Sequence, residues 1–337
     1  MSLHLVIIAT NSLLFMNQTK LQGFLRLTRP ANLVTALADI LAGAAVAFGL
    51  QSARVDPAAT ATLLGEVATQ LPLLLVATLG LYGGGVVLND VFDAELDAKE
   101  RPERPIPRGI ISVAEGAYWG GGLLVLGVLA AMWASATSGL IAASVAGLAV
   151  LYDAQSKHHP LLGPLNMGLC RGGNLLLGIS VMPELVLGAG GLLLIPLIYI
   201  AAITMVSRGE VNGGHSGTLQ LASGMYVLVI LLVTAAKPLL FKYLPGPFLD
   251  QGSLAVLNFW AMAALLALLA YFIFPPLFQA IRNPEGKKVM RAVKAGVISL
   301  IVLDAALAAG FAGLGWGLLI LALLPLSRLL ARLFAVT

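Results

Sequence analysis

The stretch NDVFDAELDAKERPERPIPRG, residues 89–109, gathers charge in a chain that contains little of it. It holds six of the chain's 16 Asp and Glu residues and directly follows the apolar run LLLVATLGLYGGGVVL. Across all 337 residues, 11% are charged and 59% hydrophobic, and the mean hydropathy is +0.93. A soluble domain of this length needs far more charge on its surface, so we expect most of the chain to lie in lipid.

Apolar segments of membrane-spanning length recur along the whole chain. A transmembrane helix needs about 20 mostly apolar residues, and short connectors separate ten such segments. We therefore predict an all-α fold, a polytopic integral membrane bundle of nine to ten transmembrane helices, in which the last two segments could form one interrupted unit. The segments lie near residues 31–50, 70–91, 115–135, 138–153, 162–182, 187–207, 217–236, 254–279, 290–310 and 313–334.

Residues 24–337 are expected to form a single transmembrane domain, preceded by an N-terminal segment over residues 1–23. That segment is apolar, but it has no Lys or Arg before its hydrophobic run and no convincing small-residue cleavage site. We do not interpret it as a signal peptide. Two readings stay open: an interfacial segment, or sequence upstream of a native start at Met16.

The basic residues indicate how the chain is oriented. With the N-terminus inside, most of the 20 Lys and Arg residues fall in inner loops, whereas Arg54, Lys237 and Lys242 fall outside. This asymmetry predicts that residues 92–114 and 208–216 lie on the cytoplasmic face. Because the basic residues sit at the ends of apolar segments, the net charge of +4 does not indicate nucleic-acid binding. Cys170 is the only cysteine, so no disulfide forms within the chain.

The acidic residues at 89–109 have a regular spacing. No Gly or Pro break stands where the preceding span runs into Asn89 and Asp90, which predicts that the helix continues through the motif. Asp90, Asp93 and Asp97 then lie on one helix face, and Glu95 points away. Three carboxylates on one face repel each other unless cations compensate them. Oxygen ligands of this kind suit Mg²⁺, which takes one or two carboxylates and completes its shell with water and phosphate.

The next segment, KERPERPIPRG, supplies the opposite charge. Its prolines favour an extended rather than helical backbone, and its arginines match phosphate oxygens in shape. Together the two segments predict a site for a metal-bound diphosphate. The alternative is a solvated helix end followed by a basic loop that obeys the positive-inside rule.

The same stretch resembles the first aspartate-rich motif of the UbiA superfamily of intramembrane prenyltransferases, NDxxDxxxDxxxRPxRPIPxG. LRLTRPANL (25–33) is similar to the entry of that family's first helix, and residues 152–178 are similar to its Tyr…Lys loop and fifth helix. The resemblance implies nine membrane helices around a central cavity that opens to the cytoplasm and laterally to lipid. It also implies transfer of a prenyl group from a prenyl diphosphate to an aromatic or lipid acceptor, with Mg²⁺ as cofactor.

The resemblance assigns roles to individual residues. Asp90, Asp93 and Asp97 would bind Mg²⁺, and Asn89 would orient the diphosphate. Further phosphate contacts are expected from Arg101, Arg104, Lys157, Arg208 and Asn32. For Arg26 and Arg29, anchoring at lipid headgroups and contact with substrate both stay open.

The family's second motif, DxxxD, is not preserved in this chain. Ser207 and Val211 stand at the two aspartate positions, and Glu210 is the only carboxylate. We expect Glu210 to act as a further metal ligand in the catalytic set, and Arg208 either to neutralise it or to contact phosphate. His215 is expected to be polar surface. Together with the tenth segment, this departure resembles the EboC-type branch, which implies an alternative role in binding or export of a secondary-metabolite precursor.

Several polar residues lie within predicted spans. For Asp153, beside Lys157, an ion pair at a helix end and a role in the site are both open. Arg171 is expected to face a cavity or a charged partner. Asp39 and Asp304 are isolated acids, for which pairing with a buried polar group and lining the cavity both stay open.

Overall fold

The computed structural model describes residues 20–209, 215–243 and 252–333. Within these ranges the chain forms helices and no strand, which confirms the all-α class. The longer helices are α2 (Pro30–Ser52), α3 (Pro57–Phe92), α5 (Val113–Ala134), α6 (Ala136–Leu151), α7 (Leu162–Ile179), α9 (Leu194–Ser207), α10 (Ser216–Tyr243), α11 (Gly252–Arg282), α12 (Gly286–Ala312) and α14 (Leu323–Leu333). The shorter ones are α4 (Ala94–Glu100), the π-helix η1 (Tyr152–Ser156), η2 (Pro183–Leu185), α8 (Val186–Ala189), η3 (Gly190–Leu193) and α13 (Leu314–Leu321).

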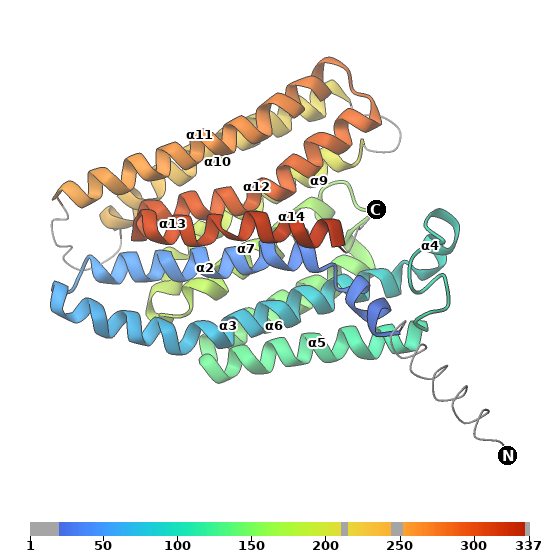
Figure 1. Ribbon diagram of the computed structural model, residues 1–337, viewed down its shortest axis with the longest axis horizontal. Coiled ribbons are helices and arrows are strands. Elements are labelled where there is room, and N and C mark those ends of the chain that lie inside the picture. Colours follow the sequence, from blue (N-terminus) through green and yellow to red (C-terminus); the bar gives the residue numbers. More distant parts are fainter. Residues whose placement is uncertain (1–19, 210–214, 244–251, 334–337) are drawn as a thin grey trace, which may run out of the picture.

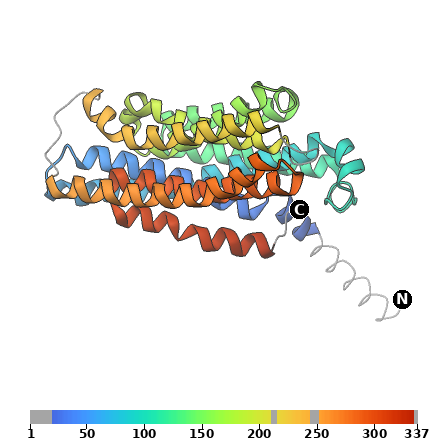
Figure 2. The same ribbon diagram turned by 90° about the horizontal axis from the view of Figure 1, so that it is seen from above.

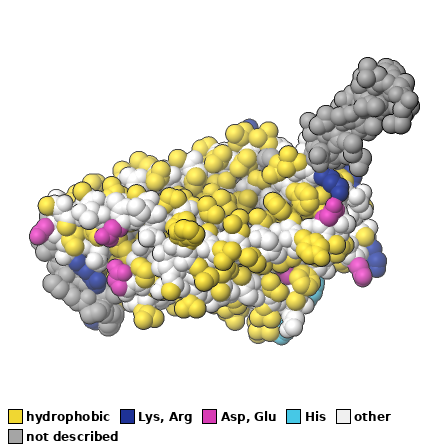
Figure 3. Space-filling view, turned by 90° about the horizontal axis from the view of Figure 1, so that it is seen from below, with side chains coloured by type: hydrophobic (Ala, Val, Ile, Leu, Met, Phe, Trp, Pro, Cys, Tyr) yellow, Lys and Arg dark blue, Asp and Glu magenta, His cyan; other side chains and the backbone are white. Residues whose placement is uncertain are grey.

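The long helices run side by side along the long axis of the molecule (Figures 1 and 2). In the described part of the chain, nine helical segments are long and apolar enough to cross a membrane. Figure 3 shows hydrophobic side chains over the middle of the molecule, with most charged side chains near its two ends. This is the surface of a polytopic membrane protein, as predicted. The last two predicted segments are two separate candidate spans rather than one interrupted unit. Gly313, with a φ of 97°, separates α12 from α13, and α14 follows α13 within the second of these spans.

Helix α3 differs from the prediction at both ends. It begins at Pro57, well before residue 70, and its 36 residues span about 54 Å at 1.5 Å per residue. The predicted continuous helix through the acidic motif is wrong, because α3 ends at Phe92 and α4 starts at Ala94. Asp93 between them has φ −90° and ψ 5°, outside the helical region.

Small residues allow the helices to pack closely. A Cβ atom on Gly80 of α3 would lie 2.5 Å from the Leu123 carbonyl oxygen of α5. A Cβ atom on Gly178 of α7 would lie 2.4 Å from the Ile40 carbonyl oxygen of α2. In lipid, where helix association depends on van der Waals contact, such close approach stabilises the bundle.

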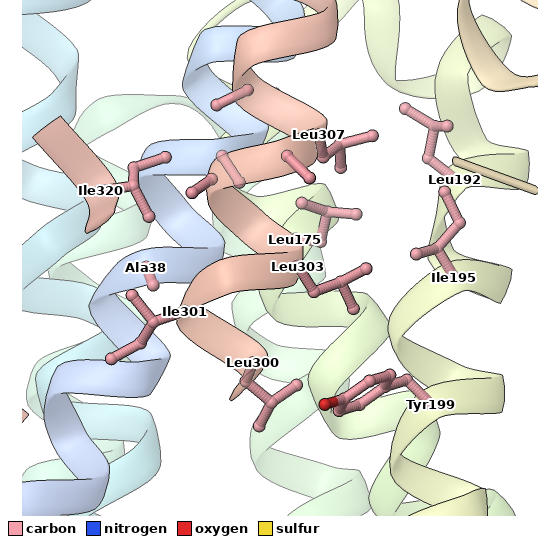
Figure 4. Close-up of a cluster of buried hydrophobic side chains, with 14 of the residues drawn as sticks. Ala38, Leu175, Leu192, Ile195, Tyr199, Leu300, Ile301, Leu303, Leu307 and Ile320 are labelled. Carbon is pink, nitrogen blue, oxygen red and sulfur yellow. The ribbon is translucent and has the colours of Figure 1, made fainter. Parts of the chain in front are cut away.

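Helices α2 and α12 form the inside of the bundle. Their most apolar windows are each 78% buried, the largest share among the candidate spans. In Figure 4, Ala38 of α2 lies on one side of α12 and Tyr199 of α9 lies on the other. The Tyr199 hydroxyl donates to the Gly296 carbonyl oxygen of α12 at 2.8 Å. Polar groups on α2 and α12 are therefore shielded from lipid by neighbouring helices.

A helical segment over residues 20–27 leads into α2. Lys20 pairs with Glu115 at the start of α5, with 2.6 Å between Nζ and Oε1. The rings of Phe24 and Trp119 lie 5.4 Å apart. These contacts hold the segment against the start of α5. The division of the chain at residues 23 and 24 stays a prediction.

Candidate active site

Two aspartates of the acidic motif converge on one guanidinium group. Arg104 Nη1 donates to Asp97 Oδ2 at 2.6 Å and to Asp90 Oδ1 at 3.1 Å. Arg29 Nη2, at the N-terminal end of α2, also donates to Asp90 Oδ1 at 2.6 Å. Both aspartates are buried. Asp90 and Asp97 therefore face a common point, which the Arg104 guanidinium occupies.

The third aspartate turns to a different partner. Asp93 forms an ion pair with Lys157, which directly follows the π-helix η1. One turn earlier on α3, Asn89 Nδ2 donates to Asp153 Oδ1 at 2.8 Å, and Asp153 is buried. Single-turn π-helices occur frequently at functional sites. Here η1 brings a carboxylate and an ammonium group to the end of α3.

A cavity of about 390 Å³ lies where α3, α4 and η1 meet. It contains acidic and basic groups together, as the binding of a metal and an anion would require. Glu95 was expected to point away from the site, but it lies at this cavity, exposed. The cavity is lined by Phe92, Asp93, Glu95, Leu96, Lys99, Asp153, Ala154, Lys157 and His158.

The proline-rich loop after α4 is not helical, as predicted, but it is folded in turns rather than extended. The backbone N–H of Ile110 donates to the Pro105 carbonyl oxygen at 3.0 Å, and Gly109 adopts a φ of 70°. The turns direct Arg104 inwards to the aspartates. Arg101 is exposed, and its backbone N–H donates to the Asp97 carbonyl oxygen at 2.8 Å.

The position of the second motif lies beside the loop that follows Lys157. Helix α9 ends at Ser207, whose hydroxyl donates to the Thr204 carbonyl oxygen at 2.9 Å. Arg208 donates to the carbonyl oxygens of Pro160 and His159, at 2.6 and 2.9 Å, in the loop that follows Lys157. Its guanidinium therefore holds this loop to the end of α9.

The remaining second-motif residues, Glu210 and Val211, lie outside the described residues. His215 is exposed, as expected for polar surface. Asn32 is half-buried in the first turn of α2, and its backbone N–H donates to the Arg29 carbonyl oxygen at 2.9 Å. This backbone bond places Asn32 close to Arg29, which forms the ion pair with Asp90.

Two residues are more prominent in the site than the sequence suggested. Arg29 has a φ of 47°, the one positive φ outside glycine among the described residues. Such a conformation costs about 1–3 kcal/mol and tends to persist at functional positions. For Asp153, the sequence allows both an ion pair at a helix end and a role in the site, and the structure places it at the cavity, bonded to Asn89. Its burial beside Asn89 could not be read from its spacing in the sequence.

The donor atoms fit a hard divalent cation. Among the described residues, no three His, Cys, Asp or Glu side chains lie close enough to form a metal centre on their own. Mg²⁺ does not require such a cage, because it binds through one or two carboxylates and substrate phosphates. Arg104 Nη1, between Asp90 and Asp97, occupies a point where a cation satisfies both carboxylates. The oxygen ligands of this site therefore suit Mg²⁺.

Comparison with known proteins bears on the same region. A model of the UbiA prenyltransferase family matches residues 40–292, which include the acidic motif, η1 and α9. The chain belongs to the UbiA prenyltransferase family. It is therefore a prenyltransferase, and its many apolar helices make it an integral membrane protein.

Relatives and solved structures agree with this family and fold. Digeranylgeranylglyceryl phosphate synthase from Ignicoccus hospitalis is 30% identical over 260 residues, covering 74% of this chain and 80% of the relative. A solved digeranylgeranylglyceryl phosphate synthase structure has a TM-score of 0.59 at 21% identity, covering 87% of this chain and 99% of the other. A UbiA homolog from Archaeoglobus fulgidus, bound to GPP and Mg²⁺, has a TM-score of 0.57 at 14% identity, with the same coverage.

Proposed function

We propose that this UbiA-family prenyltransferase catalyses Mg²⁺-dependent transfer of a prenyl group from a prenyl diphosphate to an acceptor held in the membrane. The observation that carries the proposal is the meeting of Asp90 and Asp97 on one cationic nitrogen, beside the Asp93–Lys157 pair. Carboxylates and cations alternate here within one end of the bundle. That alternation suits a metal and a diphosphate bound together.

Each residue has a distinct task in this proposal. Asp90, Asp93 and Asp97 supply the Mg²⁺ ligands, with one or two carboxylates to an ion and substrate phosphate completing its shell, and Glu210 stays a proposed further ligand. Bound Mg²⁺ supplies positive charge that stabilises the departing diphosphate. The side chains that now pair with the aspartates then turn to the phosphate oxygens, since guanidinium and ammonium groups bind both anions. These are Arg29, Arg104 and Lys157, and we retain Arg101, Arg208, Asn89 and Asn32 as further diphosphate contacts.

The acceptor is proposed to be a lipid rather than an aromatic compound. Support comes from the name of the Ignicoccus hospitalis relative, digeranylgeranylglyceryl phosphate synthase, which indicates a glyceryl phosphate acceptor for that protein. The apolar bundle would hold the prenyl chain and keep water from the reacting carbon. We also propose that the site faces the cytoplasm, because the segment 92–114 is rich in Lys and Arg, which favour the cytoplasmic side.

The test uses purified protein in nanodiscs with radiolabelled geranylgeranyl diphosphate. Geranylgeranylglyceryl phosphate and a phenolic acid are supplied as alternative acceptors. We expect a labelled lipid product, its loss with EDTA and its recovery with Mg²⁺. Asp93→Asn is expected to lower kcat/KM by about 10²–10³-fold, the scale of a lost electrostatic contact in a transition state. The exposed residue Glu100 provides a control, and Glu100→Gln should retain the wild-type rate.

Two results would count against this proposal. Transfer to the phenolic acid alone would contradict the lipid acceptor but not the reaction. No product with either acceptor and no diphosphate release, together with equal behaviour of Asp93→Asn and wild type, would contradict the reaction itself.

A second candidate function is binding or export of a precursor by a prenyltransferase scaffold. It is favoured by Ser207 and Arg208, whose side chains bond to backbone carbonyl groups at a position where the family carries a metal-binding motif. Ligand uptake by vesicles that persists in the Asp90→Asn/Asp93→Asn double variant would support it. Uptake that requires both aspartates would count against it.

A further inference from the structure

A separate charged cluster lies inside the bundle, away from the acidic motif. Asp39 of α2 is 0% exposed, Asp304 of α12 is 4% exposed and Arg171 of α7 is 6% exposed. In Figure 4, their chain neighbours Ala38 and Leu303 lie on the two inner helices. Ionisable residues at such positions are costly in a membrane protein and usually have a function.

One oxygen of Asp39 is fully engaged. Arg171 Nε lies 2.7 Å from Asp39 Oδ2, and Asn174 Nδ2 donates to the same oxygen at 2.9 Å. Arg171 Nη2 also donates to the Thr35 carbonyl oxygen at 2.5 Å. Thr78 of α3 donates to Asn174 Oδ1 at 2.7 Å. The ion pair with Arg171 and the hydrogen bond from Asn174 hold the Asp39 carboxylate in place from α7, and Thr78 of α3 fixes Asn174.

The other side of Asp39 faces a second carboxyl group. The side chains of Asp39 and Asp304 lie within hydrogen-bonding reach of each other. Neither Oδ1 of Asp39 nor Oδ2 of Asp304 receives a hydrogen bond from any other group in the described part of the chain. Two ionised carboxylates in this position would repel each other, whereas a hydrogen bond between them requires a proton on one.

The charge balance leads to the same conclusion. Two carboxylates against one guanidinium leave one negative charge inside the bundle, where desolvation strongly disfavours it. The other titratable groups nearby do not offset it. Tyr82 of α3 presents its ring to Arg171, 5.8 Å from the guanidinium carbon, and Tyr199 of α9 donates its hydroxyl to Gly296. Helix α13 contains no acid or base.

We propose that Asp39 and Asp304 bind one proton between them. With this proton the Asp39–Arg171–Asp304 cluster is neutral, and the proton completes the hydrogen bond that joins α2 to α12. The two carboxyl groups titrate as a pair, so the proton belongs to the pair rather than to either residue. None of the ion pairs and hydrogen bonds of this cluster involves the acidic motif, so the proposal does not rest on prenyl transfer.

Infrared spectroscopy tests the proposal directly. The wild-type protein at pH 8 should show a carboxylic-acid carbonyl band that shifts in D₂O. The band should be lost in both Asp39→Asn and Asp304→Asn, because either substitution removes the shared proton. It should persist in Asp56→Asn, a control at an exposed aspartate, and in Asp153→Asn, which removes another buried acid.

Thermal unfolding of the same variants provides a second readout. Asparagine imitates a protonated carboxyl group, so each single variant should melt within about 4 °C of wild type. The double variant Asp39→Asn/Asp304→Asn leaves Arg171 with no acidic partner, and its melting temperature should fall well below both single variants.

Three outcomes would overturn the proposal. The first is a wild-type spectrum at pH 8 without the carboxylic-acid band, which can be measured even if a variant fails to fold. The second is a band that survives in both single variants. The third is a melting temperature that rises with NaCl but not with choline chloride and loses this dependence in Asp304→Asn, because that result identifies an alkali cation in place of the proton.

Discussion

At the scale of single residues, the candidate site is a set of carboxylates matched to cations. Arg104 bridges Asp90 and Asp97, and Lys157 pairs with Asp93. Each pair compensates buried or half-buried charge, which would otherwise be costly to desolvate. In the proposed reaction a metal ion binds these same carboxylates and a diphosphate binds these same cationic side chains. The pairing therefore leads to predictions about stability as well as activity.

Arg104→Ala should destabilise the protein and make its stability depend on Mg²⁺. Removing the guanidinium leaves Asp97 without its partner and Asp90 with Arg29 alone. We expect a loss of about 3 kcal/mol, the lower end of values for breaking a buried pair. Thermal unfolding with and without Mg²⁺ measures it, and the ion should restore part of the loss.

The matched control for this substitution is Arg108→Ala, in the same loop and exposed to solvent. It should melt with the wild type under both conditions. If Arg104→Ala melts like Arg108→Ala, or if Mg²⁺ has the same effect on both variants, the bridging role of Arg104 is refuted.

Asp153→Asn should weaken Mg²⁺ binding without unfolding the protein. Asp153 accepts a hydrogen bond from Asn89 and lies at the cavity with Asp93. Supporting contacts of this kind change metal affinity by about 10–100-fold. Titration with Mn²⁺ followed by paramagnetic resonance gives the dissociation constant. An unchanged constant at an unchanged melting temperature would exclude this role for Asp153.

At the scale of secondary-structure elements, helix contacts through glycine hold the bundle together. The contact of α2 with α7 is an example, since Gly178 leaves no room for a side chain against the Ile40 carbonyl oxygen. Local propensity alone would favour alanine at such a position. The glycine is therefore required by helix packing rather than by the backbone conformation of α7.

Gly178→Ala should reduce stability by about 1–3 kcal/mol, the usual effect of overpacking. The added Cβ atom would lie 2.4 Å from the Ile40 carbonyl oxygen, so the two helices must separate. Gly121→Ala on α5 is the control, because its Cβ atom would meet nothing within 4 Å. The control should melt at or slightly above the wild-type temperature, and equal melting of the two variants would contradict the packing argument.

At the scale of the whole molecule, the long axis defines two polar ends and an apolar middle (Figure 3). The acidic motif, η1 and the end of α9 lie at one end. The connection between α2 and α3, with Asp56, lies at the other. The basic loops predict which end faces the cytoplasm.

Cysteine labelling in sealed cells tests this orientation. In a Cys170→Ala background, Glu100→Cys should react with a membrane-impermeant maleimide only after the cells are opened. Asp56→Cys should react in intact cells. Both positions are exposed in the structure. The reverse pattern would place the acidic motif outside and contradict the proposed cytoplasmic site.

The sequence by itself determined the membrane-embedded, all-α class of the protein and the residues that carry charge within it. Hydropathy depends on composition over about 20 residues, and the spacing of Asp90, Asp93 and Asp97 is local. Both the membrane-spanning segments and the aspartate motif can therefore be recognised from the sequence without knowledge of the tertiary structure. The sequence does not predict the helix end at Phe92, because no Gly or Pro directly before Asp93 marks the end of α3.

Only the tertiary structure decided which distant residues meet. Arg29 and Asp90 are 61 positions apart, and Arg171 and Asp39 face each other from α7 and α2. Such contacts depend on how helices cross, and crossing is set by side-chain packing between helices rather than by periodicity within one. For this reason the pairing of Asp39 with Asp304, and the placement of Asp153 beside Asn89, could be recognised only after the bundle was assembled.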